Sequence, residues 1–415
     1  MAVCLLISWT TGMHSTRINQ SRTASADRPS PGRSPVLDAS TVAETTRPQA
    51  DSGIGTSGET LESLRREIDS LDDELVALLN RRMAISRRVG RLKPATGQAV
   101  YQPDREAAVL ERVLSAGGDG PLSPRALRAI YGEILSASRD LQRALRVGYL
   151  GPEGTFTHEA ALRFFGSSAE LVPCATIEEV FLETEKGNVD HGVVGVENST
   201  AGAVAPTLDL LVDASIQVCG ELELPVSHYL LGHGELSEVR RVCSHPQALA
   251  QCRRWLGQNL PNAERVEVAS TVLAARMAEE PSTAAIAPSA AAKLYGLKVL
   301  APRIEDSSAN VTRFLVLGRE RSRRTGSDKS AIVFAVKNRP GALRDALEVF
   351  ARRGIDLTRI ESRPSRRRLW EYVFFADFRG HPDDEVVREA LAELETDALL
   401  VKVLGAWPVE RAEDR

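Results

Sequence analysis

The chain has 415 residues, a length that predicts two to four domains of roughly 100 to 200 residues each. Its apolar and charged fractions are those of a globular protein, and its formal net charge of −4 gives no bulk attraction for nucleic acid or for an anionic membrane. No apolar run approaches the roughly 20 residues that a membrane-spanning helix needs.

The first 58 residues differ from the rest of the chain. They are rich in Ser, Thr, Arg, Pro and Gly and show almost no apolar periodicity, so we expect a disordered N-terminal extension over residues 1–58. The short apolar start has no basic residue before it and makes a poor signal peptide. The acid-poor composition weakly fits a transit peptide, and a later start at Met13 is an alternative at least as strong.

The five cysteines are scattered along the chain. They form no C-x-x-C motif and no zinc-like spacing with histidine, so the sequence predicts no metal site. We expect buried thiols in a reducing cytoplasm.

A long helix is predicted at the start of the folded region. From Leu61 to Lys93 apolar residues recur every three or four positions, and Pro94 should end the helix. At 1.5 Å per residue this helix is about 50 Å long. A domain of under a hundred residues is narrower than that, so we expect the helix to pair with a partner chain. Two further helices are predicted, one over residues 103–116 and one after the cap pair Ser123 and Pro124.

Polar residues interrupt the apolar faces of these helices. Arg82 falls on the stripe of the first helix, and Lys93 lies three turns later on the same face within about 20°. Arg65 is rotated from Arg82 by about 100°, while Ser138 and Gln142 interrupt the third helix at i, i+4 spacing. A single buried arginine could set the register of a coiled coil or extend to solvent. The joint pattern favours a dianionic ligand inside the helical domain, because buried charges need partners and few acidic residues lie on these faces.

These helices resemble a known family. The segments LRREIDSLDDELVALLNRRMAISRRVGRLK and YQPDREAAVLERV, with the third helix, resemble the all-helical chorismate mutase fused at the start of bacterial P-proteins, over residues 59–145. The resemblance implies an intertwined dimer in which the arginine matching Arg65 reaches the active site of the partner chain. It also implies that carboxylates are bound by Arg82 and Arg105, that the ether oxygen is contacted by Lys93 and Gln142, and that the ring hydroxyl and a carboxylate are contacted by Glu106 and Ser138.

The reaction implied by this resemblance suits such groups. Chorismate rearranges to prephenate without proton transfer or a nucleophile, so catalysis consists of holding the reactive conformer and stabilising charge on the breaking ether bond. One position departs from the family pattern, since Gln102 stands where some members carry an acidic residue.

An α/β domain is predicted over residues 146–322, where strands alternate with helices. The glycine loop after its first strand contains Pro152 and is not G-x-G-x-x-G, so a dinucleotide site is poorly supported. The helix that follows begins after Thr155, and its N-terminus could bind a carboxylate. A buried strand ends at the run 197–199, Glu-Asn-Ser, where ligands bind in open α/β sheets.

A second strand-to-helix passage lies in the segment SHPQALAQC. Ser244 and Gln247 fit a ligand-binding strand end or simply a helix capping box, with even odds, and His245 could be an ordinary surface histidine. Asn310, Thr312 and Arg313 precede a further apolar strand.

Four motifs of this region together resemble prephenate dehydratase, namely GPEGTF, VENSTAGAV, SHPQALAQC and NVTRF. The resemblance implies two α/β lobes with a cleft between them, like a type II periplasmic binding protein, and a reaction without metal or cofactor. Thr312 matches the catalytic threonine and would donate a hydrogen bond to the departing ring hydroxyl, while Arg313 would hold a carboxylate. The other implied cleft residues are Thr155, Glu197, Asn198, Ser199, His245 and Asn310. Gly195 stands where many members have proline, a difference that should affect strand geometry more than chemistry.

The last part of the chain, residues 329–410, follows a charged linker and has the order β-α-β-β-α-β, which predicts a ferredoxin-like α+β domain. A plain dimerisation module is one interpretation. The segments GALR and ESRP resemble the two phenylalanine-binding motifs of ACT regulatory domains. This resemblance implies an L-phenylalanine site at Asn338, Gly341, Ala342, Leu343, Glu361, Ser362, Arg363 and Pro364.

The sequence thus predicts a multidomain enzyme: a helical mutase domain, a two-lobed dehydratase domain and an ACT domain. The expected reactions convert chorismate to prephenate and prephenate to phenylpyruvate, with inhibition by L-phenylalanine, in a cytoplasmic homodimer or larger homo-oligomer without nucleic-acid or membrane partners. Two alternatives stay open, an arogenate-preferring dehydratase and a non-catalytic solute-binding sensor. Oligomer order and channelling between the sites are not readable from the sequence.

Overall fold

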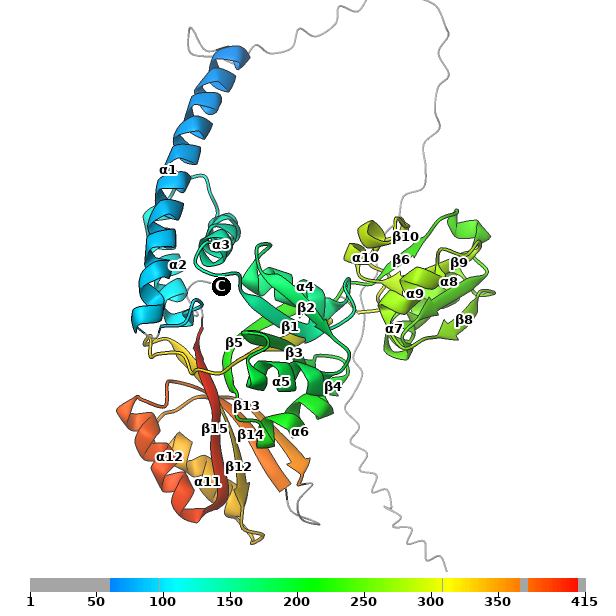
Figure 1. Ribbon diagram of the computed structural model, residues 1–415. Coiled ribbons are helices and arrows are strands. Elements are labelled where there is room, and N and C mark those ends of the chain that lie inside the picture. The colour runs from blue at the N-terminus through cyan, green and yellow to red at the C-terminus, as the bar shows by residue number, and fades with distance from the viewer. Residues whose placement is uncertain (1–59, 97, 308, 366–371, 410–415) are drawn as a thin grey trace, which may run out of the picture. The chain divides into compact units, whose positions relative to one another are not determined.

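The computed structural model describes residues 60–96, 98–307, 309–365 and 372–409 (Figure 1). The predicted N-terminal extension therefore lies outside the described residues, as does the last residue of the predicted ACT domain.

Three helices form the first region: α1 (Leu61–Thr96), α2 (Pro103–Gly117) and α3 (Pro124–Asp140). Ser123 caps α3 as predicted, because its side chain accepts a hydrogen bond from the Ala126 N–H. The predicted end of α1 at Pro94 is wrong by two residues. A proline disturbs only the bond of its own nitrogen and the carbonyl four residues earlier, so the last turn of a helix tolerates it.

Helix α1 closely approaches the segment that follows α3 at one glycine. A Cβ atom on Gly90 would lie 2.7 Å from the Cα atom of Gln142, so any larger residue would push this segment away from α1. This glycine is the local reason that Gln142 lies directly against α1.

The second region contains two sheets, each covered by helices. The first sheet has the order β2-β1-β3-β11-β5, with the short β4 paired to β3. Its elements are β1 (Arg146–Leu150), α4 (Phe156–Phe165), β2 (Glu170–Cys174), α5 (Ile177–Lys186), β3 (His191–Asn198), β4 (Gly202–Ala203), α6 (Ala205–Asp213), β5 (Gln217–Pro225) and β11 (Val311–Gly318).

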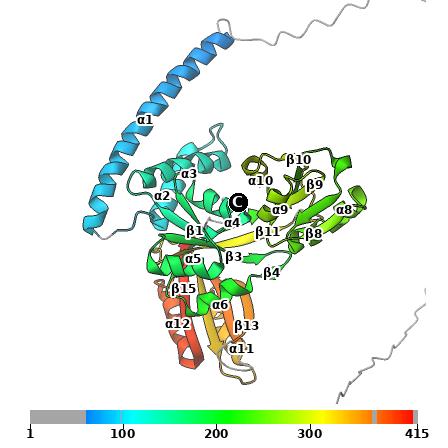
Figure 2. The same ribbon diagram turned by 45° about the vertical axis from the view of Figure 1, so that its right-hand side comes forward.

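The second sheet repeats this arrangement with the order β10-β6-β9-β7-β8. Its strands lie together with α8, α9 and α10 in a lobe of their own (Figure 2). The chain enters this lobe after β5 and returns through β11, so two segments connect the lobes. Its elements are β6 (Tyr229–Gly232), η1 (Leu236–Glu238), β7 (Arg241–Ser244), α7 (Pro246–Gln251), α8 (Arg253–Asn259), β8 (Glu264–Glu267), α9 (Thr271–Met277), β9 (Thr283–Ala287), α10 (Ser289–Leu294) and β10 (Lys298–Ala301). The predicted two-lobed α/β domain is confirmed.

The third region is the predicted β-α-β-β-α-β unit, with strand order β13-β14-β12-β15. Helices α11 and α12 pack on one face of its sheet (Figure 1). The elements are β12 (Asp328–Val336), α11 (Ala342–Ala351), β13 (Leu357–Pro364), β14 (Tyr372–Arg379), α12 (Glu385–Asp397) and β15 (Ala398–Pro408). The ferredoxin-like prediction is confirmed.

The other face of this sheet shares a core with the first lobe of the α/β domain. Phe375 and Trp407 lie in one buried cluster with Val194 and Leu208. Strand β15 also pairs with β5 at Gly405 and Val218. A Cβ atom on Gly405 would lie 2.0 Å from the Val218 carbonyl oxygen, so this backbone contact requires glycine.

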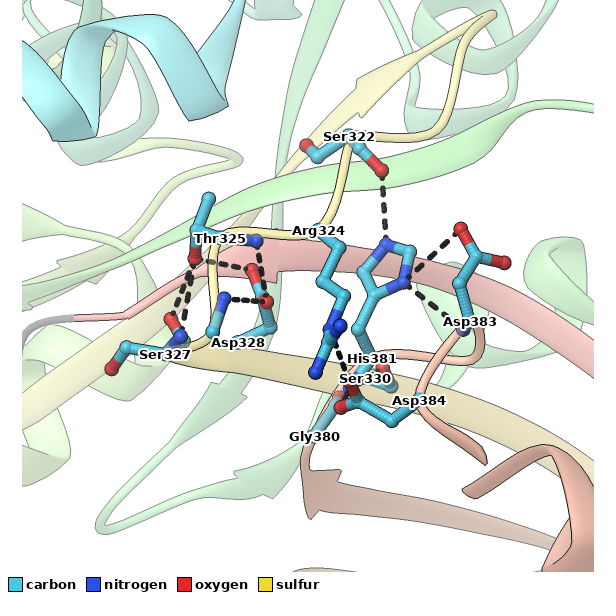
Figure 3. A network of polar contacts seen from close by, with 11 residues as sticks. Ser322, Arg324, Thr325, Ser327, Asp328, Ser330, Gly380, His381, Asp383 and Asp384 are labelled. Atoms are coloured by element: carbon cyan, nitrogen blue, oxygen red, sulfur yellow. Dashed lines mark hydrogen bonds and ion pairs between the residues drawn. The ribbon is translucent and has the colours of Figure 1, made fainter. Parts of the chain in front are cut away.

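The linker between the α/β and C-terminal domains is held by a polar network (Figure 3). The fully buried ring of His381 contacts the Ser322 carbonyl oxygen through Nε2 at 3.0 Å. The carboxylate of Asp328 accepts hydrogen bonds from the Thr325 hydroxyl and from two backbone N–H groups of the turn. The charged linker predicted from composition is therefore fixed where it enters β12.

Candidate active sites

The end of β3 and the start of β11 bring the predicted catalytic residue Thr312 together with the predicted cleft residue Asn198. Asn198 and Thr312 are cross-strand partners, and Asn198 Nδ2 lies 2.8 Å from Thr312 Oγ1. The same amide nitrogen lies 2.8 Å from Asn310 Oδ1. Residues more than a hundred positions apart in the chain thus form one hydrogen-bonded group.

The orientation of the Asn198 amide is set by the backbone. Its Oδ1 accepts hydrogen bonds from the N–H groups of Thr200 and Ala201 at 3.1 and 2.9 Å. Because N–H groups only donate, Nδ2 must be the end that faces Thr312. The Thr312 oxygen is then an acceptor, and its own proton remains available to a ligand.

Asn310 carries a donor that the protein does not satisfy. Its side chain is 2% exposed, and its Nδ2 has no hydrogen-bond partner among the described residues. Buried polar atoms are normally paired, so this donor makes Asn310 a candidate position for a ligand contact next to Thr312. Ser199 lies nearby in a structural role, since its hydroxyl donates to the Ala309 carbonyl oxygen and accepts from the Val311 N–H.

Two further residues join this group and were not predicted. Gln251 Nε2 donates to the Thr200 hydroxyl at 2.8 Å, and Gln251 Oε1 lies 2.7 Å from His228 Nε2. Burial lowers the pKa of His228, so the ring is neutral at pH 7 and Nε2 carries its proton. His228 Nδ1 is then a buried acceptor, and it has no partner within the described residues. A histidine in the short crossing from β5 to β6 was the available sequence signal.

Two predicted residues act as helix caps. The Thr155 side chain accepts from the His158 N–H, and the His245 side chain accepts from the Gln247 N–H. The capping-box alternative for Ser244 is wrong, because the buried Ser244 hydroxyl donates to the Ile286 carbonyl oxygen and His245 is the cap. Neither Thr155 nor His245 is hydrogen-bonded to the Asn198–Thr312 group in the described parts of the chain, and their contact with substrate stays a prediction.

Arg313 and Glu197 contact the C-terminal domain instead of Thr312. The Arg313 guanidinium pairs with Glu221 at 2.6 Å and with Asp377 of β14 at 2.6 Å, and Glu197 pairs with Arg359 of β13 at 2.6 Å. Adjacent residues of a strand point to opposite faces, which separates Arg313 from Thr312. Its partners are carboxylates of the protein, so the geometry gives no support to a substrate carboxylate on Arg313.

The helical region holds a second set of unsatisfied polar atoms. Arg82 Nη1 and Gln142 Oε1 are buried, and neither has a hydrogen-bond partner in the described residues. Lys93 is 9% exposed, and its Nζ donates to the Val100 carbonyl oxygen at 2.7 Å. Burial lowers the pKa of Lys93. Both Arg82 and Lys93 act electrostatically on Glu106, so the three predicted residues converge.

The remaining predicted residues of this region differ in burial. Ser138 is buried and its hydroxyl lies 2.6 Å from that of Ser86. Glu106 is bound by Arg139, a residue that the sequence did not single out. Arg105 and Arg65 are exposed on α2 and α1. Exposed arginines fit a role at a partner chain, and their substrate contacts stay predictions.

The predicted phenylalanine motifs lie on two faces of the C-terminal sheet. Glu361 and Arg363 point to the dehydratase side with Arg359, and Arg363 pairs with Asp209 of α6 at 3.1 Å. Ser362 pairs with Phe374 of the opposite face, which α11 covers. Gly341 begins α11 with a φ of 80°, a conformation that favours glycine. A cavity of about 280 Å³ beside Ala342 is lined by α11 and α12 and by none of residues 361–364.

No helix in the described residues is long and apolar enough to cross a membrane. The described residues also contain no group of three or more His, Cys, Asp or Glu side chains that could hold a metal ion.

Comparisons with known proteins match the three regions in order. Sequence models of protein families match chorismate mutase type II at residues 64–143, prephenate dehydratase at 147–322 and the ACT domain at 330–396. A protein of Aquifex aeolicus described as bifunctional chorismate mutase/prephenate dehydratase is 45% identical over 355 residues, which are 84% of this chain and 98% of that protein.

Two solved structures are similar over the second and third regions. The prephenate dehydratase of Arthrobacter aurescens in complex with L-Phe is 36% identical with a TM-score of 0.59, covering 65% of this chain and 92% of that chain. A structure described as GqqA, a novel type of quorum-quenching acylase, is 29% identical with the same TM-score and covers 65% of this chain and 99% of that chain. Since the printed activities of these two differ, the residues at the strand ends carry the argument for a reaction.

Proposed function

The chain belongs to the bifunctional chorismate mutase/prephenate dehydratase family, and from this premise we propose that it converts chorismate to prephenate and prephenate to phenylpyruvate under inhibition by L-phenylalanine. One observation carries the proposal. Buried polar atoms that have no partner among the described residues lie at family motif positions in both catalytic domains: Arg82 Nη1 and Gln142 Oε1 in the first, and Asn310 Nδ2 in the second.

The mutase reaction needs fixed donors and no proton transfer. Arg82 offers an unpaired guanidinium nitrogen to a substrate carboxylate. Lys93 is held near the site by the Val100 carbonyl oxygen, and its ammonium stabilises the negative charge that develops on the ether oxygen as the C–O bond breaks. Gln142 Nε2 donates one hydrogen bond to the Ser138 carbonyl oxygen at 3.0 Å, and its second N–H would donate to the same ether oxygen. The close approach at Gly90 fixes the position of this side chain. The Glu106 carboxylate accepts a hydrogen bond from the ring hydroxyl of the substrate.

The dehydratase reaction needs one proton donor. The bond to the ring carboxylate breaks and releases CO₂, its electron pair forms the aromatic ring, and the ring hydroxyl leaves with a proton as water. Thr312 is arranged for this step, because Asn198 donates to its oxygen and leaves the hydroxyl proton free. A threonine is a weak acid, so formation of the aromatic ring supplies most of the driving force.

Inhibition by L-phenylalanine is proposed to act through β13. Strand β13 contains the segment ESRP and also carries Arg359 and Arg363, which pair with Glu197 and Asp209 of the dehydratase domain. Glu197 directly precedes Asn198, so a ligand that moves β13 also moves the residue that orients Thr312. The phenylalanine carboxylate would lie at the start of α11 near Gly341, where backbone N–H groups point outward.

A second copy of the chain is the proposed partner of α1. Its apolar stripe is exposed along the helix, at 57% for Leu71, 53% for Leu75 and 57% for Leu78. Such a surface is too apolar to remain in water, and the matching stripe of another copy covers it in an intertwined helical dimer. Arg65 on the same helix would then reach the second active site.

The cysteines support a reducing compartment. Cys174, Cys219, Cys243 and Cys252 are buried free thiols. We propose a cytoplasmic location on this ground.

The test is a coupled assay that starts from chorismate and follows phenylpyruvate. Formation of phenylpyruvate that stops with added L-phenylalanine supports the proposal, and binding of chorismate without turnover would favour a solute-binding sensor. Competition between prephenate and arogenate decides the arogenate alternative, which differs by an amino group on the side chain.

A further inference from the structure

Arg139 is a buried arginine that connects the two catalytic domains. Its side chain is 6% exposed. Nη1 lies 2.6 and 2.5 Å from the two carboxylate oxygens of Glu106, and Nη2 lies 2.5 Å from the Phe165 carbonyl oxygen. Its guanidinium lies over the Tyr101 ring at 5.7 Å from the ring centre. The guanidinium therefore contacts α2, the last residue of α4 and the segment before α2.

The contact with Phe165 uses a helix end. Phe165 is the last residue of α4, and the final carbonyl groups of a helix lack intrahelical partners. A cation at this end is favourable because the helix dipole is negative there. The dehydratase domain thus supplies a fixed anchor that sets where the guanidinium lies in the mutase domain.

Glu106 is surrounded by three cations and one phenol. Arg139 approaches it from α3, Arg82 and Lys93 from α1, and Tyr101 from the segment before α2. Burial raises the pKa of Glu106, and Arg139 opposes this as the largest of the lowering influences. Without Arg139 the carboxyl would be held less firmly and would keep its proton to higher pH.

We propose that Arg139 is a positioning residue for the mutase reaction, which fixes the Glu106 carboxylate as the acceptor for the substrate ring hydroxyl and anchors it to the dehydratase domain through Phe165. This proposal rests on the mutase activity proposed above. It assigns a function to a buried residue of α3 that the sequence did not single out.

The test is the pH profile of mutase kcat/KM for Arg139→Gln in the full-length chain. We expect a loss of roughly 10- to 100-fold at neutral pH, since hydrogen bonds to charged groups are the stronger ones. We also expect the acid limb to move up by roughly one pH unit or more, because a neighbouring guanidinium lowers a carboxyl pKa by that amount. Dehydratase activity on prephenate should change little, and the acid limb would not move if Arg139 were only structural.

Arg143→Gln is the matched control. Arg143 follows α3 and pairs with Asp190 of the dehydratase domain at 2.6 Å, so it also joins the two domains, but it does not contact Glu106. Its loss should leave the mutase pH profile unchanged. A shift of equal size in this control would overturn the proposal, because domain contact alone would then explain the effect.

A double substitution separates this proposal from the proposed function. In a Glu106→Gln background, Arg139→Gln should add little further loss, since the two residues act as one unit. Full additivity overturns the positioning role. An absence of mutase activity in the unmodified chain overturns the proposed function itself. Should Arg139→Gln fail to fold, Arg139→Lys keeps a charge and is expected to show the same shift at smaller size, and an unshifted profile in that variant overturns the proposal.

Discussion

Arg359 Nε lies 2.6 Å from Glu197 Oε2, so the edge strand of the C-terminal domain is bonded to the residue next to Asn198. The Arg359 side chain is 11% exposed and the Glu197 side chain 38% exposed, so water reaches the pair mainly from the glutamate side. This contact gives a direct physical route from the phenylalanine motif 361–364 to the hydroxyl of Thr312.

Arg359→Gln should weaken inhibition by L-phenylalanine while the uninhibited dehydratase remains active. Allosteric coupling is typically about 1–3 kcal/mol, so the half-inhibiting concentration should rise roughly 5- to 150-fold. The measurement is prephenate turnover against phenylalanine concentration. The control is Arg379→Gln, which removes an exposed pair with Asp356 in the same domain. Unchanged inhibition in Arg359→Gln would exclude this route. Point substitutions are preferable to deletion of the C-terminal domain, because this domain and the dehydratase domain share a buried core.

Thr312→Ala should lower dehydratase activity roughly 100-fold or more and leave mutase activity intact, because only the dehydratase site loses its hydrogen-bond donor. Thr312→Ser should retain part of the activity, since it keeps the hydroxyl that Asn198 orients. Turnover of prephenate and of chorismate is measured for each variant. A serine variant as inactive as alanine would mean that the threonine methyl group or the backbone matters.

Arg82→Ala should raise the activation free energy of the mutase reaction by about 3 kcal/mol, which lowers kcat/KM roughly 100-fold, while prephenate turnover stays nearly unchanged. Arg81→Ala is the control, because Arg81 is the exposed neighbour on the same helix. Equal loss of both activities in a folded Arg82 variant would contradict the assignment of separate sites.

Lys93→Ala should lower the mutase kcat more than it changes KM, since the charge on the ether oxygen exists only in the transition state.

Leu71→Asp combined with Leu78→Asp should weaken self-association and mutase activity together. Both leucines are exposed on α1 in the single chain, so the charge is harmful only if another chain covers them. Sedimentation velocity measures the association, and Asp73→Asn on the opposite face of the helix is the control. Unaltered association would place the interface elsewhere.

Stability should fall as the pH decreases from about 6.5, and His191 is one identifiable cause. Burial lowers the pKa of His191 to about 4 from 6.5, and its ring nitrogen Nδ1 contacts the Leu317 carbonyl oxygen at 3.2 Å. Between these pH values the unfolded chain binds a proton at His191 that the folded chain does not. The free energy of unfolding that is present above pH 6.5 is therefore lost as the pH falls, by an amount on the order of 3 kcal/mol at full effect. In denaturant unfolding, His191→Gln should show a shallower pH dependence, and an unchanged slope would assign the effect to other groups.

The sequence by itself determined the elements and the three domains. Apolar spacing identified α1 and α3, and the cap of α3 at Ser123 could be predicted. The alternation of strands and helices predicted the α/β domain, and the order of the last six elements predicted the ferredoxin-like domain. These features depend on neighbouring residues, so they are visible in one dimension. The end of α1 was placed two residues early because the effect of Pro94 depends on its position within the last turn.

Only the tertiary structure decided which polar side chains meet. Asn198, Asn310 and Thr312 were predicted as one group. Gln251, which lies in the quoted segment SHPQALAQC but was not singled out, and His228, from the crossing between β5 and β6, also join it. Arg313 and Glu197 were predicted beside the substrate and instead contact the C-terminal domain, because strand alternation and domain packing determine which way each side chain points. Arg139 followed the predicted Ser138 unnoticed, since its partners Glu106 and Phe165 are brought to it only by packing between α2, α3 and α4.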